Sequence, residues 1–249
     1  MFKKNLALVK KKFPRLYQEL SSANKPETNP ELGIVQSRTG LPVAYLTRDG
    51  RKVFINSSYD PEQEADRWVK SNFEPETSGS CILCGGGFFY HVKALLEAGL
   101  FKKLVVYEPN LDILKTCMRT IDFEPILQHN NLYIVTGSDF DDMARGVVVF
   151  LGSETLYSDA NLHSKSLPCY LDLFGAEINK FLTKFREQIT LFQLNLTTLD
   201  NFAKEWLFNS FKNLNGAINS PVVSGFFEKF RSIPAVLVSA GPSVEKNIQ

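Results

Sequence analysis

Short apolar runs that alternate with helical patterns, the first run ending in three consecutive glycines, constrain the fold of this chain more than any other feature. The runs occupy residues 81–84, 104–107, 132–135 and 147–151. Between them, apolar residues recur every three or four positions at residues 92–96 and 111–121, and a short helix is expected at residues 139–144. Alternating strands and helices predict a parallel sheet with helices on both faces. We therefore expect an α/β fold centred on a Rossmann-like, methyltransferase-like sheet over residues 80–152.

The segment before this sheet is predicted to form a helix and a β-hairpin. Residues 5–21 show a helical apolar stripe despite Pro14, whereas residues 22–41 are polar and rich in turn formers. Apolar residues alternate on both sides of Asp49-Gly50, which favours a hairpin over residues 43–55. Asp60 and Pro61 suit the N-cap and first turn of a helix that ends near Phe73.

The segment after the sheet is predicted to be helical. Apolar residues keep a spacing of three to four over residues 174–199 and again over residues 202–214, which predicts two long amphipathic helices that pack as a pair. We thus expect an N-terminal subdomain over residues 1–78, the Rossmann-like domain over residues 79–165 and a C-terminal long-helix segment over residues 166–232.

Charge and hydropathy exclude several classes of protein. The 249 residues carry 28 basic and 27 acidic side chains, a net charge of +1, which argues against a dedicated nucleic-acid partner. No apolar run approaches the roughly 20 residues that cross a bilayer, so membrane insertion is not expected. The N-terminus lacks the apolar stretch of a secretory signal. These features predict a cytoplasmic protein.

Four cysteines do not form a disulfide framework or a metal site in this sequence. Cys81 and Cys84 make a C-x-x-C, but in a strand they point to opposite faces and lie about 10 Å apart. Neither a second C-x-x-C nor clustered histidines complete a zinc site. We expect both cysteines to lie in the core and no metal to be bound.

The glycines Gly85, Gly86 and Gly87 follow a strand and open a helix, as in phosphate- and ribose-binding turns. Glu108 ends the next strand, where a carboxylate accepts hydrogen bonds from ribose hydroxyls. This pair is shared by dinucleotide and S-adenosylmethionine pockets, although Tyr90 stands where G-x-G-x-x-G has its third glycine. Either a bound nucleotide-type ligand or a purely structural glycine turn fits the pattern. The nucleotide- or cofactor-binding candidates are Gly85, Gly86, Gly87, Tyr90, His91, Glu108, Asn110 and Asp139.

Asp139 belongs to an Asp-x-Asp triplet with Asp141, a pattern with which glycosyltransferases hold a metal and a nucleotide. The competing interpretation is a helix cap. His91 adjoins the glycine turn and either touches a ligand or makes a structural hydrogen bond. No Ser-His-Asp or Cys-His arrangement is evident, so catalytic residues are not assigned.

The last residues show the opening of a further domain. Residues 235–239 predict a buried strand, Gly241, Pro242 and Ser243 a turn, and the residues after them a helix start. We expect residues 233–249 to begin a second Rossmann-like unit and the chain to be a fragment that stops just inside it.

Together these pieces resemble the bacterial motility-associated factor (Maf) family. The resemblance rests on Ser58-Tyr59-Asp60-Pro61 with Glu64-Ala65, on residues 85–91, on Glu108-Pro109-Asn110 and on residues 238–244. It implies flagellin glycosylation, in which a nonulosonic acid passes from a CMP-sugar to Ser or Thr. It also implies that Gly241, Pro242 and Ser243 belong to the donor-nucleotide loop of a central transferase domain. Phe89 replaces the last glycine of the family's turn, and Val244 replaces a leucine.

The leading hypothesis is an N-terminal scaffold or recognition region of a Maf-like glycosyltransferase that does not transfer sugar alone. Its expected partners are its own C-terminal transferase domain and flagellin. Two alternatives remain open. One is an enzyme that uses S-adenosylmethionine or NAD at Gly85, Gly87 and Glu108. The other is part of a protein similar to pterin diphosphokinases, whose central domains are related.

Overall fold

The computed structural model describes residues 1–22, 31–156 and 162–234. The chain forms two compact units, Met1–Leu196 and Thr197–Gln249. The first unit contains both β-sheets, and the second contains the later part of one long helix and a 3₁₀ helix, η2 (Val223–Phe226). The predicted strand and turn at residues 235–243, including Gly241, Pro242 and Ser243, lie outside the described residues.

The centre of the first unit is a four-stranded parallel sheet, which confirms the predicted fold class. Its strands are β4 (Ser80–Cys84), β5 (Lys103–Glu108), β6 (Leu132–Thr136) and β7 (Leu162–Ser166), in the order β6-β5-β4-β7. All five residues of β4 are buried. A strand covered on both faces has no need of alternating polar positions, and this explains the continuous apolar run.

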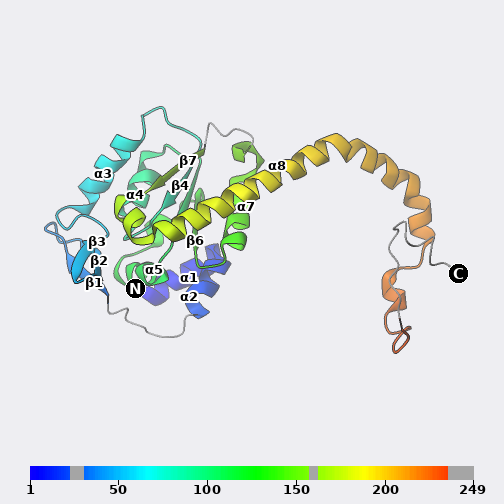
Figure 1. The fold of residues 1–249 in the computed structure, drawn as a ribbon, viewed down its shortest axis with the longest axis horizontal. Helices are drawn as coiled ribbons and strands as arrows, with labels where there is room; N and C mark the ends of the chain where they lie inside the picture. The colour runs from blue at the N-terminus through cyan, green and yellow to red at the C-terminus, as the bar shows by residue number, and fades with distance from the viewer. Residues whose placement is uncertain (23–30, 157–161, 235–249) are drawn as a thin grey trace. The chain divides into compact units, whose positions relative to one another are not determined.

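Helices cover both faces of this sheet (Figure 1). They are α4 (Tyr90–Ala98), α5 (Leu111–Thr120), α6 (Glu124–Leu127), α7 (Phe140–Leu156) and the first part of α8 (Pro168–Asn219). On one face, Tyr107 of β5 stacks on Phe181 of α8 at 4.2 Å between ring centroids. Tyr133 of β6 stacks on Phe150 of α7 at 5.0 Å on the same face. Glu108, the next residue after Tyr107, points to the opposite face, as alternation along a strand requires.

The predicted strand at residues 147–151 is wrong, because these residues belong to helix α7. Val147, Val148 and Leu151 are buried, whereas Val149 is 78% exposed. This burial pattern follows a helical period of three to four residues instead of the alternation of a strand. The β-branched residues suggested a strand, and tertiary packing of one helical face overrode that preference.

Two strands were missed by the sequence analysis. β7 has the polar sequence Leu-His-Ser-Lys-Ser and lies at the edge of the sheet, where partial exposure removes the need for apolar residues. β1 (Leu32–Gln36) lies in the stretch that was interpreted as turns. It pairs with β2 and makes the expected hairpin a three-stranded antiparallel sheet.

The hairpin itself and the helix after it are confirmed. β2 (Pro42–Arg48) and β3 (Arg51–Phe54) pair in antiparallel register around Asp49 and Gly50. Helix α3 (Pro61–Asn72) begins with Asp60 as its N-cap, whose carboxylate accepts a hydrogen bond from the amide of Gln63 at 2.9 Å. The cap satisfies one of the free amides at the helix start.

The N-terminal helix of the prediction is two helices, α1 (Phe2–Lys12) and α2 (Pro14–Ser22). Pro14 is the first residue of α2, where its missing N–H costs no helical hydrogen bond. It has no amide hydrogen to donate back into α1, so the first helix ends before it.

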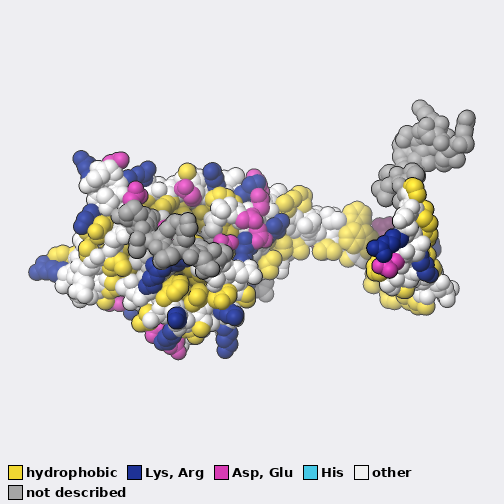
Figure 2. Space-filling view, turned by 90° about the horizontal axis from the view of Figure 1, so that it is seen from below, with side chains coloured by type: hydrophobic (Ala, Val, Ile, Leu, Met, Phe, Trp, Pro, Cys, Tyr) yellow, Lys and Arg dark blue, Asp and Glu magenta, His cyan; other side chains and the backbone are white. Residues whose placement is uncertain are grey.

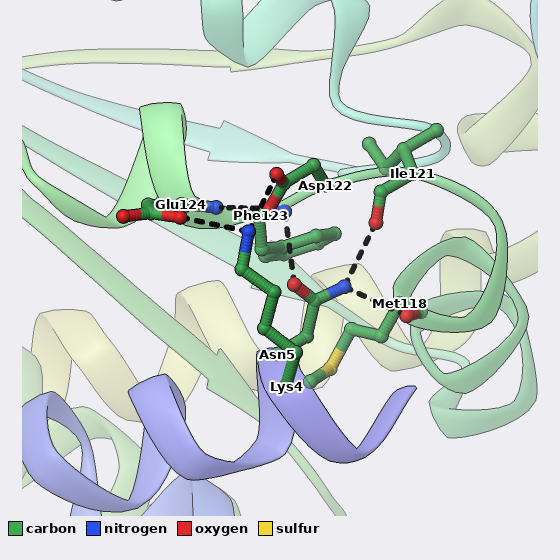
Figure 3. A network of polar contacts seen from close by, with 7 residues as sticks. All are labelled: Lys4, Asn5, Met118, Ile121, Asp122, Phe123 and Glu124. Atoms are coloured by element: carbon green, nitrogen blue, oxygen red, sulfur yellow. Dashed lines mark hydrogen bonds and ion pairs between the residues drawn. The ribbon is translucent and has the colours of Figure 1, made fainter. Parts of the chain in front are cut away.

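A buried asparagine fastens α1 to the parallel-sheet domain (Figure 3). The Asn5 amide donates to the carbonyl oxygens of Met118 and Ile121, both at 2.8 Å, and the Phe123 amide donates to its Oδ1 at 3.1 Å. These carbonyls belong to the end of α5, where helical carbonyls lack intrahelical partners. Asn5 thus satisfies a helix end 113 residues away in sequence.

The C-terminal helices are not a pair. A single helix, α8, runs over Pro168–Asn219, with non-helical dihedral angles at Phe174 (φ −135°, ψ 25°). Neither glycine nor proline separates the two predicted stripes between Leu199 and Phe202, so nothing in the sequence breaks the helix there. Within the described ranges, no helix, α8 included, combines the length and apolar character required to cross a membrane.

Candidate functional site

The predicted site lies where the parallel sheet reverses its strand order. β5 and β6 extend to one side of β4, and β7 lies on the other side. In open α/β sheets, ligands bind outside the carboxyl ends of the strands at such a reversal. Gly85–Gly87 follow β4 at this edge, and residues 167–170 follow β7. The topology therefore places the glycine turn at the position expected for a nucleotide site.

The Glu108 carboxylate is fully buried and surrounded by donors from the protein itself. Its Oε2 accepts hydrogen bonds from the amides of Gly86 (2.9 Å) and Gly87 (3.1 Å) and from the Tyr170 hydroxyl (2.6 Å). Its Oε1 accepts from the Asn110 amide at 3.0 Å. Gly86, Gly87, Glu108 and Asn110 are thus brought together, and their hydrogen-bonding groups are directed at one another.

Burial has the largest effect on the pKa of the Glu108 carboxyl group. Loss of solvation raises the pKa of Glu108 to about 7, although the hydrogen bonds from Tyr170, Asn110, Gly86 and Gly87 lower it. The four donors offset only part of the cost of burying the anionic form. Glu108 therefore titrates near neutral pH while remaining part of an internal network.

Tyr170 is the residue of this site that the sequence analysis missed. It is fully buried, its hydroxyl donates to Glu108, and it accepts a hydrogen bond from the Gly87 amide at 2.8 Å. Its ring lies so close to Gly85 that a Cβ there would sit 2.6 Å from two ring carbons. Recognising β7 would have placed the residues after Ser166 at this edge of the sheet and pointed to Tyr170.

The other two glycines also face protein side chains. A Cβ on Gly86 would meet the Phe89 ring at 2.8 Å, and one on Gly87 would meet Ile55 at 2.8 Å. Asn56, next to Ile55, accepts a hydrogen bond from the Phe88 amide at 3.3 Å. The glycines permit close approach, and the side chains that approach them are those of Tyr170, Phe89 and Ile55.

Phe89 adopts a backbone conformation that favours glycine. Its φ and ψ are 61° and 14°, in the left-handed region, and it is the residue immediately before α4. Glycine adopts this region without strain because it lacks a Cβ, whereas phenylalanine does not. The Phe89 ring is buried against Phe123 at 4.8 Å between centroids, so side-chain packing offsets the backbone strain.

Tyr90, His91 and Asp139 lie elsewhere or serve local structure. The Tyr90 hydroxyl donates to the carbonyl of Pro42 at 2.8 Å, and its side chain lines a cavity of about 130 Å³ between α3 and α4. His91 packs on Trp68, and its Nδ1 lies 3.4 Å from the Asn56 amide nitrogen. Burial lowers the pKa of His91 to about 4, so it is neutral at physiological pH. Asp139 accepts from the Asp142 amide at 3.0 Å, as expected of a cap for α7.

Cys81 and Cys84 are core residues, as predicted. Cys81, Cys84 and Cys117 are buried and free, and burial raises the pKa of both Cys81 and Cys84 to about 12. In the portion of the chain that the structure describes, no group of three or more His, Cys, Asp or Glu side chains is arranged to hold a metal ion.

The fold and the site define a Rossmann-like domain whose glycine turn is closed by the protein's own side chains. A family model described as "Glycosyltransferase Maf N-terminal domain" matches residues 36–194. The chain therefore belongs to the Maf N-terminal domain family. It is also 24% identical over 263 residues to an "Uncharacterized protein" of Treponema pallidum (strain Nichols), an alignment that covers 99% of this chain and 82% of that protein.

Proposed function

We propose that this chain is a scaffold or recognition region of a Maf-like protein that takes part in flagellin glycosylation, in which a nonulosonic acid passes from a CMP-sugar to Ser or Thr. The family match supports the Maf-like role. One observation supports a non-catalytic role for the Rossmann-like domain. The Glu108 carboxylate and the Gly86 and Gly87 amides, which a nucleotide would need, are hydrogen-bonded to one another.

The closed turn also links the parts of the domain. Tyr170 connects α8 to the glycine turn, and Asn56, in the segment that follows β3, is hydrogen-bonded to the same turn. Cys169, next to Tyr170, donates from its thiol to the carbonyl of Ile55 at 3.3 Å. A turn that is hydrogen-bonded to both α8 and the segment after β3 suits a rigid scaffold better than a site that must admit a ligand.

The second unit offers a surface for a partner. Seven apolar side chains in the later part of α8 form a stripe and are between 46% and 72% exposed; they are Leu199, Phe202, Trp206, Leu207, Phe211, Leu214 and Ile218. Figure 2 shows hydrophobic side chains at the surface of this part of the chain. We call this stripe the α8 apolar face. A continuous apolar surface of this kind typically marks a protein–protein contact. We propose a Maf-type transferase domain as its partner and flagellin as the substrate protein that the assembly recognises.

The test of the non-catalytic role is calorimetry of this chain with CMP, CMP-nonulosonate, S-adenosylmethionine and NAD, together with an assay of CMP-nonulosonate turnover. We expect neither binding heat nor turnover. Turnover by this chain alone would refute the proposal.

The alternative of a cofactor-dependent enzyme rests on the strand order and on the position of the glycine turn. It requires Tyr170 to leave the turn. Micromolar binding of S-adenosylmethionine or NAD that is lost in Glu108→Ala would favour it. Lys93→Ala serves as the matched control, because the Lys93 side chain is half exposed and pairs with Glu62 instead of with the groups of the turn.

A further inference from the structure

The Tyr170 hydroxyl is hydrogen-bonded to both groups with which a Rossmann site binds a nucleotide, the acid at the end of the second strand and the glycine turn. It donates to the acid at the end of the second strand, Glu108 (2.6 Å), and it accepts from a glycine-turn amide, that of Gly87 (2.8 Å). In nucleotide-binding members of this fold, the same acid binds the ribose and the glycine turn approaches the phosphates. Tyr170 thus takes up the hydrogen-bonding capacity of the ribose-binding acid and of one amide of the glycine turn.

The Tyr170 ring contacts the glycine turn, the part of a Rossmann site that a bound nucleotide contacts. It is in contact with Gly85 at the reversal between β4 and β7, and it is completely buried. Gly85 has a φ of +105° and no Cβ, so its backbone permits this approach. The ring and the hydroxyl of Tyr170 together occupy the position, at the reversal of strand order, where ligands bind in open α/β sheets.

The segment that bears Tyr170 is short and separately anchored. Its start is fixed by a hydrogen bond from the Leu167 amide to the carbonyl of Cys84 at 3.1 Å. Its end is the break in α8 at Phe174. Tyr170 therefore enters the crevice from a short helical segment, and we expect truncation of its side chain to leave the backbone of the glycine turn in place.

We propose that the crevice at Gly85–Gly87 is a latent ribonucleoside site whose ribose position is occupied by Tyr170. The inference rests on the proposed function, in which the wild-type crevice is closed. It adds the class of ligand that the crevice accepts when the phenol is removed. The group that recognises the ribose is the Glu108 carboxylate, beside the Gly87 amide that Tyr170 releases, and the required feature of the ligand is its pair of 2′- and 3′-hydroxyls.

The test measures the melting temperature of wild type and Tyr170→Ala with adenosine, cytidine, their 2′,3′-dideoxy analogues or p-cresol. We expect adenosine or cytidine to raise the melting temperature of Tyr170→Ala and not that of wild type. The dideoxy analogue should bind about tenfold more weakly or worse, because it lacks a hydrogen bond to a charged group. In Tyr170→Ala/Glu108→Gln the preference for the ribonucleoside should disappear.

Stabilisation of Tyr170→Ala by p-cresol but by neither nucleoside would overturn the proposal, since Tyr170 would then only fill space. If Tyr170→Ala does not fold, Tyr170→Leu is tested in the same way, and refolding of Tyr170→Ala by a ribonucleoside is monitored by circular dichroism. Absence of a ribonucleoside effect in both variants also overturns it. Ribonucleoside binding by wild type would instead contradict the closed crevice, so the two failures are distinguishable.

Discussion

At the scale of single residues, the structure contains a natural comparison between two buried tyrosines. The Tyr170 hydroxyl is hydrogen-bonded to Glu108 and Gly87, whereas the Tyr107 hydroxyl has no hydrogen-bond partner among the described residues. Tyr170→Phe should lower the free energy of unfolding by about 1.5–3 kcal/mol, because a buried carboxylate loses a donor. Tyr107→Phe, the matched control, should be neutral or stabilising. Urea denaturation measures both, and equal effects would contradict the network.

The contribution of the Glu108 carboxyl group to the free energy of unfolding falls as the pH rises, which is opposite to the usual behaviour of a carboxylate. Its pKa is about 7 in the folded protein and near 4.5 ordinarily, so the stability it contributes is present below pH 4.5 and lost as the pH rises to 7. The loss amounts to roughly 3 kcal/mol at about 1.4 kcal/mol per pKa unit. Glu108→Gln lacks this titration. From pH 4 to pH 8 its free energy of unfolding should therefore rise relative to wild type by about that amount.

This prediction is checked by chemical denaturation of wild type and Glu108→Gln at a series of pH values. Taking the difference between the two proteins cancels the titration of carboxylates that they share. A difference that is constant across the series would show that Glu108 keeps an ordinary pKa in the fold.

At the scale of secondary-structure elements, Asn5 holds α1 against the end of α5. Asn5→Ala removes three hydrogen bonds to Met118, Ile121 and Phe123 and leaves buried backbone groups without partners. We expect a loss of about 2 kcal/mol or more in the free energy of unfolding. Lys4→Ala, which removes only exposed ion pairs with Asp122 and Glu124, should cost less. Equal costs in thermal or urea unfolding would show that Asn5 is not the anchor.

The elements that the sequence predicted correctly are those with a strong local signal. Asp60 and Pro61 marked the start of α3, and the apolar run at residues 81–84 marked the central strand. The misses have physical causes. A strand was predicted at residues 147–149 because β-branched residues favour strands, whereas these residues belong to α7. Strand β7 was overlooked because an edge strand tolerates polar residues such as His163, Ser164 and Lys165.

The same limits apply to the candidate site. The glycines, Glu108 and Asn110 were identifiable, because the spacing of a strand, turn and acid is local in sequence. Tyr170 was not, since its role depends on β7 lying beside β4 and on a contact 62 residues away from Glu108. Nothing in the spacing of the motif shows that a side chain of the protein occupies the crevice.

At the scale of the whole molecule, the α8 apolar face predicts association. Leu207→Lys and Phe211→Lys should abolish binding to a Maf-type transferase domain without altering the melting temperature of the Met1–Leu196 unit, because both residues lie in the other unit. Lys212→Glu, outside the apolar stripe, is the control and should bind normally. Co-purification or calorimetry measures this, and undiminished binding by both lysine variants would exclude this face as the contact.

The central claim is that the Rossmann-like crevice is closed by the protein itself, and NMR of the Gly86 and Gly87 amides tests it most directly. Both amides donate to the buried Glu108 carboxylate. We predict that both exchange slowly with solvent and that their chemical shifts do not change when CMP, adenosine or S-adenosylmethionine is added to the wild-type chain. Rapid exchange, or saturable shifts with any of these ligands, would contradict it.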